Sequence, residues 1–190
     1  MNTLVFATHN PNKLIEVQAL LPNYKIISLE DLKLTEEIPE TGQTLKENAL
    51  IKAKYVYDKF GFDCFADDTG LEVDALDGAP GVYSARYAGE PSDSEKNIKK
   101  LLKALEGNPN RNAQFKTVIC LIQNGKIFYF EGVCPGEILI CKTGTSGFGY
   151  DPIFKPAQSS LSFAQMNQED KGAISHRGLA IKNLINYLCK

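Results

Sequence analysis

The amino-acid sequence predicts an α/β fold in which helices flank one mixed sheet. Strand-like apolar runs alternate with helical patterns at the start of the chain, which is typical of βα units. Farther along, Asn124-Gly125 separates two β-rich runs, and Asn-Gly is the strongest short-range signal for an antiparallel hairpin. Because parallel and antiparallel pairing are both expected, the sheet is predicted to be mixed.

The first elements are a predicted strand, a polar turn and a helix. Leu4 to Ala7 is a short apolar run that favours a buried strand. Asn10 can cap the following helix, and Pro11 falls at its first position, where the missing N–H costs nothing. Apolar residues then continue at helical spacing: Leu14, Val17 and Leu21.

A second strand and helix are predicted next. The strand covers Tyr24 to Leu29, and Thr44-Leu45-Lys46-Glu47 has the capping-box spacing for a helix that reaches about Phe60. Cys64-Phe65-Ala66 is predicted as an inner strand that ends at Asp67-Asp68-Thr69-Gly70, and residues 71–73 as a separate extended piece.

The remaining elements follow a Gly- and Pro-rich loop that extends to Gly89. An amphipathic helix is predicted after Ser92 to Glu95, and Gly107 ends it. The hairpin strands cover 115–122 and 127–133, and a last helix covers about Ser175 to Leu188 with Ile181, Leu184, Ile185 and Leu188 toward the core. With no internal repeat and no linker, residues 1–190 are expected to form a single domain.

The composition of the chain limits the binding partners and the cellular compartment that can be expected for it. The net charge of −2 gives no basic field to hold a nucleic acid backbone, so nucleic acid is not an expected partner. Cysteines 64, 120, 134, 141 and 189 form no C-x-x-C pair and are expected to be buried free thiols. No signal peptide or run of about 20 apolar residues is seen, so no membrane association is expected and a cytoplasmic location is predicted.

The turn from Thr8 to Lys13 is a candidate phosphate-binding site. It places a hydroxyl, an amide and an ammonium at a helix start, where backbone N–H groups and the helix dipole attract anions. It matches neither G-x-x-x-x-G-K-[ST] nor G-x-G-x-x-G. A well-capped turn without a ligand is the alternative interpretation.

Asp67 and Asp68 are candidate catalytic acids. Side chains alternate faces along a strand, so one of the pair can face a ligand while the other supports it. Glu40 could supply a second oxygen to a hard cation such as Mg²⁺, which uses one or two carboxylates together with substrate phosphates. Solvated loop acids are the alternative for all three residues.

Two segments are candidates for binding a planar base. Glycines surround Phe148 in Ser146-Gly147-Phe148-Gly149-Tyr150-Asp151-Pro152, which lets the backbone approach a flat ligand. Ser175-His176-Arg177 puts cations at a helix N-terminus, where the dipole opposes them, so an anion or acceptor should face them. A tight aromatic loop and an internal ion pair with Glu169 or Asp170 are the alternatives.

Together, these segments resemble the inosine triphosphate pyrophosphatase family, also described as non-standard purine NTP pyrophosphatases. The resemblance covers nearly the whole chain in sequence order. The matching stretches are Phe6-Ala7-Thr8-His9-Asn10-Pro11-Asn12-Lys13, Glu40-Thr41-Gly42, Glu47-Asn48-Ala49 with Lys52, Ala66-Asp67-Asp68-Thr69-Gly70-Leu71, Gly78-Ala79-Pro80-Gly81, Gly147-Phe148-Gly149-Tyr150-Asp151-Pro152 and Ser175-His176-Arg177-Gly178.

The resemblance implies an elongated mixed-sheet α/β fold, a homodimer, and Mg²⁺-dependent hydrolysis of ITP, dITP and XTP to the monophosphate and pyrophosphate. Asp68 would act as general base and, with Glu40, would organise Mg²⁺. Thr8, Asn10, Lys13 and Lys52 would hold the triphosphate. The other substrate-binding residues in this part of the chain would be His9, Pro11, Asn12 and Thr69. The purine pocket would be formed by Phe148, Asp151, Lys171, His176 and Arg177, and Gly149 and Tyr150 would also bind the substrate.

Two positions depart from the family pattern, because His9 stands where Gly or Asn is more usual and Thr69 where Ser is more usual. One competing hypothesis is a phosphomonoesterase with an aspartyl nucleophile, which would want D-x-D after the first strand, where Thr8 to Lys13 stands instead. Another is a nucleotide-sensing module without turnover, which would not need Asp68.

Overall fold

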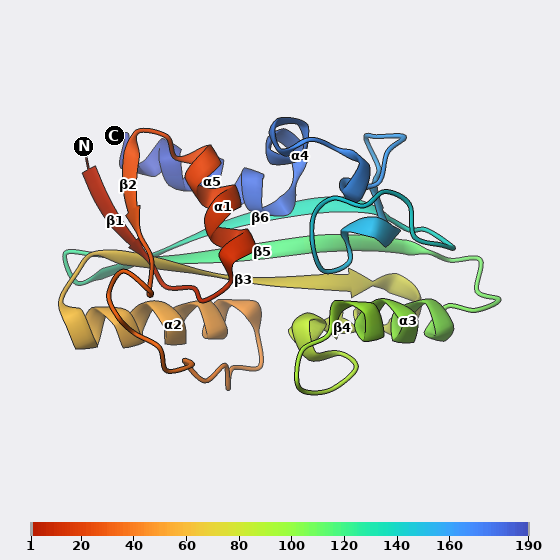
Figure 1. Ribbon diagram of the computed structural model, residues 1–190, viewed down its shortest axis with the longest axis horizontal. Coiled ribbons are helices and arrows are strands. Elements are labelled where there is room, and N and C mark those ends of the chain that lie inside the picture. Colours follow the sequence, from red (N-terminus) through yellow and green to blue (C-terminus); the bar gives the residue numbers. More distant parts are fainter. Residues whose placement is uncertain (1, 190) are drawn as a thin grey trace. The chain divides into compact units, whose positions relative to one another are not determined.

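The computed structural model describes residues 2–189, and the strands in that range form one seven-stranded sheet with helices on its faces (Figure 1). The strand order is β2-β1-β3-β5-β6-β7, and β4 pairs with β3. β1 pairs in parallel with β2 and β3, whereas β3 with β4 and β6 with β7 are antiparallel. The predicted mixed-sheet α/β fold is confirmed.

The elements are bounded as follows. The strands are β1 (Asn2–Phe6), β2 (Tyr24–Ile27), β3 (Cys64–Val73), β4 (Pro80–Gly81), β5 (Asn112–Gln123), β6 (Lys126–Ile138) and β7 (Phe154–Pro156). The α-helices are α1 (Pro11–Leu20), α2 (Leu45–Phe60), α3 (Ser94–Ala104), α4 (Gln168–Ile174) and α5 (His176–Leu188). Short 3₁₀ helices are η1 (Asp74–Leu76), η2 (Ser84–Arg86), η3 (Asp151–Ile153) and η4 (Phe163–Gln165).

The chain divides into two compact units. The first contains Met1–Asp68, Thr117–Gly132 and Arg177–Lys190, and the second contains Thr69–Lys116 and Val133–His176. Strands β3, β5 and β6 therefore contribute residues to both units.

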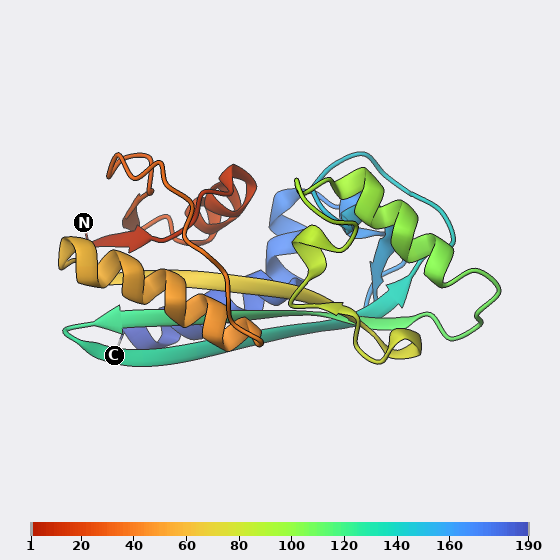
Figure 2. The ribbon, with the colours of Figure 1, turned by 90° about the horizontal axis from the view of Figure 1, so that it is seen from below.

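Local signals set the predicted element starts in the first unit. The Asn10 side chain accepts hydrogen bonds from the backbone N–H groups of Asn12 (2.9 Å) and Lys13 (3.3 Å), which fixes the start of α1. Thr44 and Glu47 form the predicted capping box at the start of α2. Asn124 and Gly125 both have positive φ, as the predicted two-residue turn between β5 and β6 requires (Figure 2).

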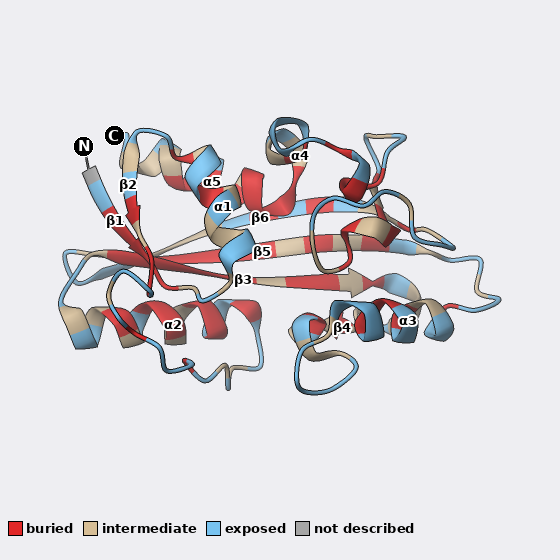
Figure 3. Ribbon diagram, in the orientation of Figure 1, coloured by how far each residue is buried: buried red, intermediate tan, exposed pale blue. Residues whose placement is uncertain are grey.

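Strand alternation divides the core of the first unit into two layers. On the face covered by α2, strand residues such as Val5, Cys64 and Ala66 pack with the helix residues Ala49, Ala53 and Val56. On the face covered by α1 and α5, Phe6 and Phe65 stack at 4.6 Å between ring centroids, within a cluster that includes Val17, Ile181 and Leu184. Figure 3 shows these strands as largely buried.

The second unit has its own apolar core. Ile98 and Leu101 of the predicted amphipathic helix α3 are buried in one cluster with Phe115, Phe154 and Phe163. The Asp93 side chain caps α3 by accepting the N–H of Lys96.

Two predictions about the fold were wrong in detail. β3 does not end at Asp67, because it continues through the acids to Val73 and pairs there with β4. Of the cysteines predicted to be buried, Cys141 and Cys189 are exposed. Ile185 and Leu188, predicted to face the core, are partly buried and pack against the core cluster, so their predicted orientation is confirmed. Among residues 2–189, no helix combines the length and apolar character that a membrane span needs.

Candidate active site

Asp67 and Asp68 lie on opposite faces of β3, in the first unit. Asp67 follows Phe65 on the face covered by α1 and α5, whereas Asp68 follows Ala66 on the face covered by α2. Both acids are buried, with 2% and 6% of their surface exposed. Each therefore needs a partner of its own.

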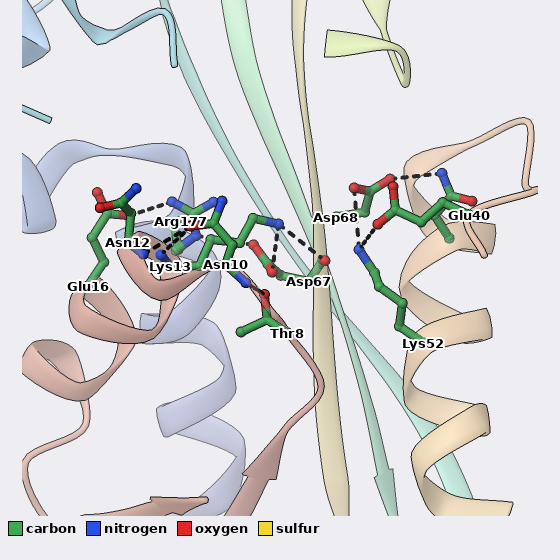
Figure 4. A network of polar contacts seen from close by, with 11 residues as sticks. Thr8, Asn10, Asn12, Lys13, Glu16, Glu40, Lys52, Asp67, Asp68 and Arg177 are labelled. Atoms are coloured by element: carbon green, nitrogen blue, oxygen red, sulfur yellow. Dashed lines mark hydrogen bonds and ion pairs between the residues drawn. The ribbon is translucent and has the colours of Figure 1, made fainter. Parts of the chain in front are cut away.

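The partners of Asp67 are two cations from distant parts of the chain (Figure 4). Lys13 Nζ of α1 lies 2.9 Å from Asp67 Oδ1, and Arg177 Nε of α5 lies 3.1 Å from Asp67 Oδ2. Arg177 also pairs through NH1 with Glu16 of α1. The anionic partners predicted for the cations at the start of the last helix are thus Asp67 and Glu16, while Asp170 bonds to Asn167 at the start of α4.

The ion pairs with Lys13 and Arg177 control the ionisation of Asp67. Burial acts to raise the pKa of Asp67, but Lys13 and Arg177 outweigh it and hold that pKa well below its usual range. Burial also lowers the pKa of Lys13, which Asp67 only partly offsets. Asp67 is therefore a fixed anion that keeps two buried cations in place.

Asp68 lies in a different environment (Figure 4). Lys52 Nζ of α2 lies 3.6 Å from Asp68 Oδ1 and also pairs with Glu40. Asn48 Nδ2, from the first turns of α2, donates a hydrogen bond of 3.1 Å to Asp68 Oδ2. Two acids thus share one ammonium, and a neutral amide supplies a further contact.

Burial raises the pKa of Asp68, and the nearby cations of Lys52 and Lys13 only partly oppose this. For Lys52, burial acts to lower the pKa, but Asp68 and Glu40 outweigh it, so the pKa is raised. A carboxyl group with a raised pKa is a stronger base once ionised, which suits general-base chemistry.

The residues around Asp68 fit a hard divalent cation. Glu40 and Asp68 converge on the single ammonium of Lys52, so this position already accommodates positive charge. Within residues 2–189 there is no cluster of three or more His, Cys, Asp or Glu side chains that could hold a metal. Two carboxylates nevertheless match Mg²⁺, which takes its other ligands from water and phosphate.

The predicted phosphate-binding turn precedes α1. Thr8 Oγ1 accepts the N–H of Asn10 at 3.1 Å, so the turn is held by its own side chains. His9 Nε2 donates to the carbonyl oxygen of Glu36 at 3.0 Å, which ties the turn to the loop that carries Glu40. Pro11 and Asn12 are exposed on the first turn of α1.

The second unit brings together several residues of the predicted purine pocket. Lys171 Nζ lies 2.7 Å from Asp151 Oδ2 and 5.1 Å from the centre of the Phe148 ring. Asp151 Oδ2 also accepts the N–H of Phe148. A Cβ at Gly147 would come within 2.1 Å of that oxygen, so this turn requires glycine.

The other residues of this unit that were predicted to bind the substrate lie in different surroundings. His176 is buried and stacks on Phe115, with 4.4 Å between ring centroids. The Tyr150 hydroxyl donates to the carbonyl oxygen of Ser84, which makes it a packing residue. Gly149 has positive φ, and Thr69 is half-buried on β3.

Sequence reasoning did not single out Glu16 and Asn48. Glu16 lies three residues after Lys13, a spacing that places both on one face of a helix. Asn48 lies within the matched Glu47-Asn48-Ala49 stretch, but a helical Asn gives no sign of what it contacts.

Comparisons with known proteins define the family. The Ham1 family model matches residues 4–187. A Flavobacterium johnsoniae protein named dITP/XTP pyrophosphatase is 58% identical over 186 residues, which cover 97% of each chain. A Porphyromonas gingivalis protein of the same name is 50% identical over 190 residues, covering 99% of this chain and 98% of that one. The solved structure of a HAM1 protein from Coxiella burnetii has a TM-score of 0.90 at 40% identity, covering 100% of this chain and 99% of that one. The chain belongs to the Ham1 family, which confirms the resemblance inferred from the motifs.

Proposed function

We propose that this protein hydrolyses non-standard purine nucleoside triphosphates, namely ITP, dITP and XTP, to the monophosphate and pyrophosphate. Such hydrolysis would remove these nucleotides before they enter DNA or RNA. Relatives named dITP/XTP pyrophosphatase match over nearly the whole chain. Their names support the substrate class.

The observation that carries the proposal is the pairing of acids and cations around β3. Lys13 and Lys52 supply positive charge for a triphosphate, and Glu40 with Asp68 supplies carboxylates for a metal. When bound at Glu40 and Asp68, Mg²⁺ would neutralise phosphate charge. Asp68 is the general base in this proposal.

In the proposed reaction, Asp68 takes a proton from a water molecule whose oxygen attacks the α-phosphorus. The bond between the α-phosphorus and the bridging oxygen to the β-phosphorus breaks, and pyrophosphate leaves with the bonding electron pair. Lys13 and Lys52 hold the phosphate oxygens and stabilise the charge on the leaving group. No covalent enzyme intermediate is required.

Isotope labelling tests this reaction directly. The protein is incubated with ITP and Mg²⁺ in ¹⁸O-labelled water, and the products are analysed by mass spectrometry. We expect IMP and pyrophosphate, with the label in IMP because the α-phosphorus is attacked. Label in pyrophosphate would show attack at the β-phosphorus, and IDP with orthophosphate would refute the proposal. Asp68→Asn, purified in the same way, controls for contaminating phosphatases.

The competing hypotheses give different results in the same experiment. An aspartyl phosphomonoesterase would release orthophosphate, and a sensing module would bind ITP without turnover. The first is disfavoured because no D-x-D follows β1.

Base selectivity is proposed for residues of the second unit. ITP presents a C6 carbonyl and an N1–H, whereas ATP presents an amino group and an unprotonated N1, so the hydrogen-bond pattern is inverted. Lys171 and His176 can donate to the carbonyl, and Asp151 can accept from N1–H. We expect kcat/KM for ITP to exceed that for ATP by at least about 10²-fold, because mismatched buried groups stay unpaired. Equal kcat/KM values for the two nucleotides would refute this assignment.

Three further properties are proposed from the family resemblance and the composition. We propose a single functional domain over residues 1–190 and a homodimer, and a monomer mass by light scattering at micromolar concentration would refute the dimer. Five free cysteines fit a reducing compartment, which supports a cytoplasmic location.

A further inference from the structure

Asn48 occupies the space between Asp68 and the loop that carries Glu40. Its surface is completely buried. Asn48 Nδ2 donates to Asp68 Oδ2 at 3.1 Å, and Asn48 Oδ1 accepts the backbone N–H of Gly42 at 2.8 Å. One side-chain amide therefore links the candidate base to the backbone two residues after Glu40.

The approach of the loop to this amide is close. A Cβ at Gly42 would come within 2.7 Å of Asn48 Oδ1 and 3.0 Å of the Asn48 backbone nitrogen. Only glycine fits there without displacing its neighbours. Asn48 itself is fixed, because it is the fourth residue of α2 and its N–H bonds to the Thr44 carbonyl oxygen at the capped helix start.

Lys52 and Asn48 contact different oxygens of Asp68. Lys52 approaches Oδ1 with a charged ammonium on a long side chain. Asn48 engages Oδ2 with a short, neutral side chain that does not compete with a cation. The Asn48 bond thus orients the carboxylate with Oδ1 on the side of Lys52 and Glu40.

We propose that Asn48 is a positioning residue that sets Asp68 and Glu40 at the spacing required to hold one divalent cation. The inference rests on the proposed function in that it concerns the same acid pair. Partners that orient metal ligands in this way typically contribute about 10–100-fold to metal affinity or activity.

The fold offers a matched control in the second unit. Asn97 is the fourth residue of α3 and is 3% exposed. Its side chain accepts the N–H of Ala88 at 2.6 Å and donates to the carbonyl oxygen of Ala85 at 2.9 Å. Asn97→Leu therefore removes a buried, doubly bonded amide at the same helix position, but one that bonds to the backbone of Ala85 and Ala88 and not to a candidate metal ligand.

The experiment compares Asn48→Leu with Asn97→Leu. Mn²⁺ is titrated in the absence of nucleotide and followed by electron paramagnetic resonance, and the Mg²⁺ requirement of ITP hydrolysis is measured separately. We expect both variants to lose thermal stability. Only Asn48→Leu should bind Mn²⁺ about 10–100-fold more weakly, and excess Mg²⁺ should restore part of its kcat.

Gly42→Ala perturbs the same amide from the other side and leaves every carboxylate in place, so it serves if Asn48→Leu does not fold. We expect the same direction of change in Mn²⁺ affinity. Unchanged Mn²⁺ binding in the folded variants would overturn the inference while ITP hydrolysis by the wild type still stands. If the wild type fails to hydrolyse ITP but Asn48→Leu still weakens Mn²⁺ binding, the proposed function fails and the positioning role of Asn48 is supported.

Discussion

The two faces of β3 hold neighbouring acids in opposite electrostatic conditions. On the α1 and α5 face, Asp67 has a full cation on each oxygen, and its pKa is held well below the usual range. On the α2 face, Asp68 shares the single ammonium of Lys52 with Glu40, and burial raises its pKa. With Glu16, the site of Asp67 has two acids and two cations, whereas the site of Asp68 has two acids and one cation.

This difference separates structural from chemical roles. A carboxylate with two fixed cations has little capacity to take a proton or a further cation. A carboxylate that is short of positive charge can do both, at a cost in stability. We therefore propose that Asp67 itself fixes Lys13 and Arg177, and with them α1 and α5, whereas Asp68 takes part in the proposed reaction.

The largest expected effect is on stability, for Asp67→Asn. This change leaves Lys13 and Arg177 buried without their shared anion, and breaking a buried pair by removing one partner typically costs about 3–5 kcal/mol. Urea unfolding at pH 7 measures the free energy of unfolding. A variant as stable as the wild type would show that Asp67 does not hold the network.

The pH dependence of that loss checks its origin. The pKa of Asp67 is lower in the folded than in the unfolded protein, so its stabilisation is present above the unfolded value and is lost as the pH falls through the folded value. The stability difference between wild type and Asp67→Asn should therefore be constant near neutral pH and shrink below about pH 4, the unfolded pKa of Asp. A difference that does not change with pH would point to lost packing instead.

The next effect is on catalysis, for Asp68→Asn. This variant keeps the shape of the side chain but removes the base and one metal charge, so kcat for ITP should fall by at least about 10²-fold. Initial rates at saturating ITP and Mg²⁺ measure it. Full activity in Asp68→Asn with an inactive, well-folded Asp67→Asn would reverse the two roles.

Much of the fold was predictable because it depends on short-range signals. The Asn10 cap, the capping box at Thr44 and the Asn124-Gly125 turn each act within a few residues, and each is confirmed. The continuous β3 was not predicted, because Asp-Asp-Thr-Gly has the composition of a turn. What keeps this segment extended is the burial of its acids against cations that come from α1, α2 and α5.

The same distinction applies to the candidate site. Alternation along a strand predicts that Asp67 and Asp68 face opposite sides of the sheet. It does not predict which residues each acid contacts there. The dipole at the start of α5 predicts an anion near Arg177, yet the sequence offered Glu169 and Asp170 as neighbours, whereas Glu16 lies 161 residues away. Such partners depend on tertiary packing, which no local pattern encodes.

A smaller effect is expected for Glu16→Gln. Glu16 is the outer partner of Arg177, and the change keeps a hydrogen-bond acceptor while Asp67 retains the guanidinium. Loss of a charged hydrogen-bond partner should cost about 1.5–3 kcal/mol, less than the loss in Asp67→Asn. Urea unfolding of Glu16→Gln, Asp67→Asn and the double variant measures whether the two acids are coupled. Additive losses would show that Arg177 does not connect them.

The smallest expected effect is on the stability of Asp68→Asn, and it sharpens the comparison most. The pKa of Asp68 is higher in the folded than in the unfolded protein, so ionisation costs stability as the pH rises from the unfolded toward the folded value. Asp68→Asn cannot ionise, so it avoids this loss of stability, and Lys52 keeps Glu40 as its partner.

We therefore expect metal-free Asp68→Asn at pH 7 to be as stable as the wild type or slightly more stable. Near pH 3, where Asp68 is protonated in both states, the variant should lose this advantage. Urea unfolding with a chelator at both pH values measures the difference. A loss in the free energy of unfolding as large as that of Asp67→Asn would mean that the ionised Asp68 stabilises the fold as much as Asp67 does. The two faces of β3 would then differ in the partners of their acids but not in the role of those acids.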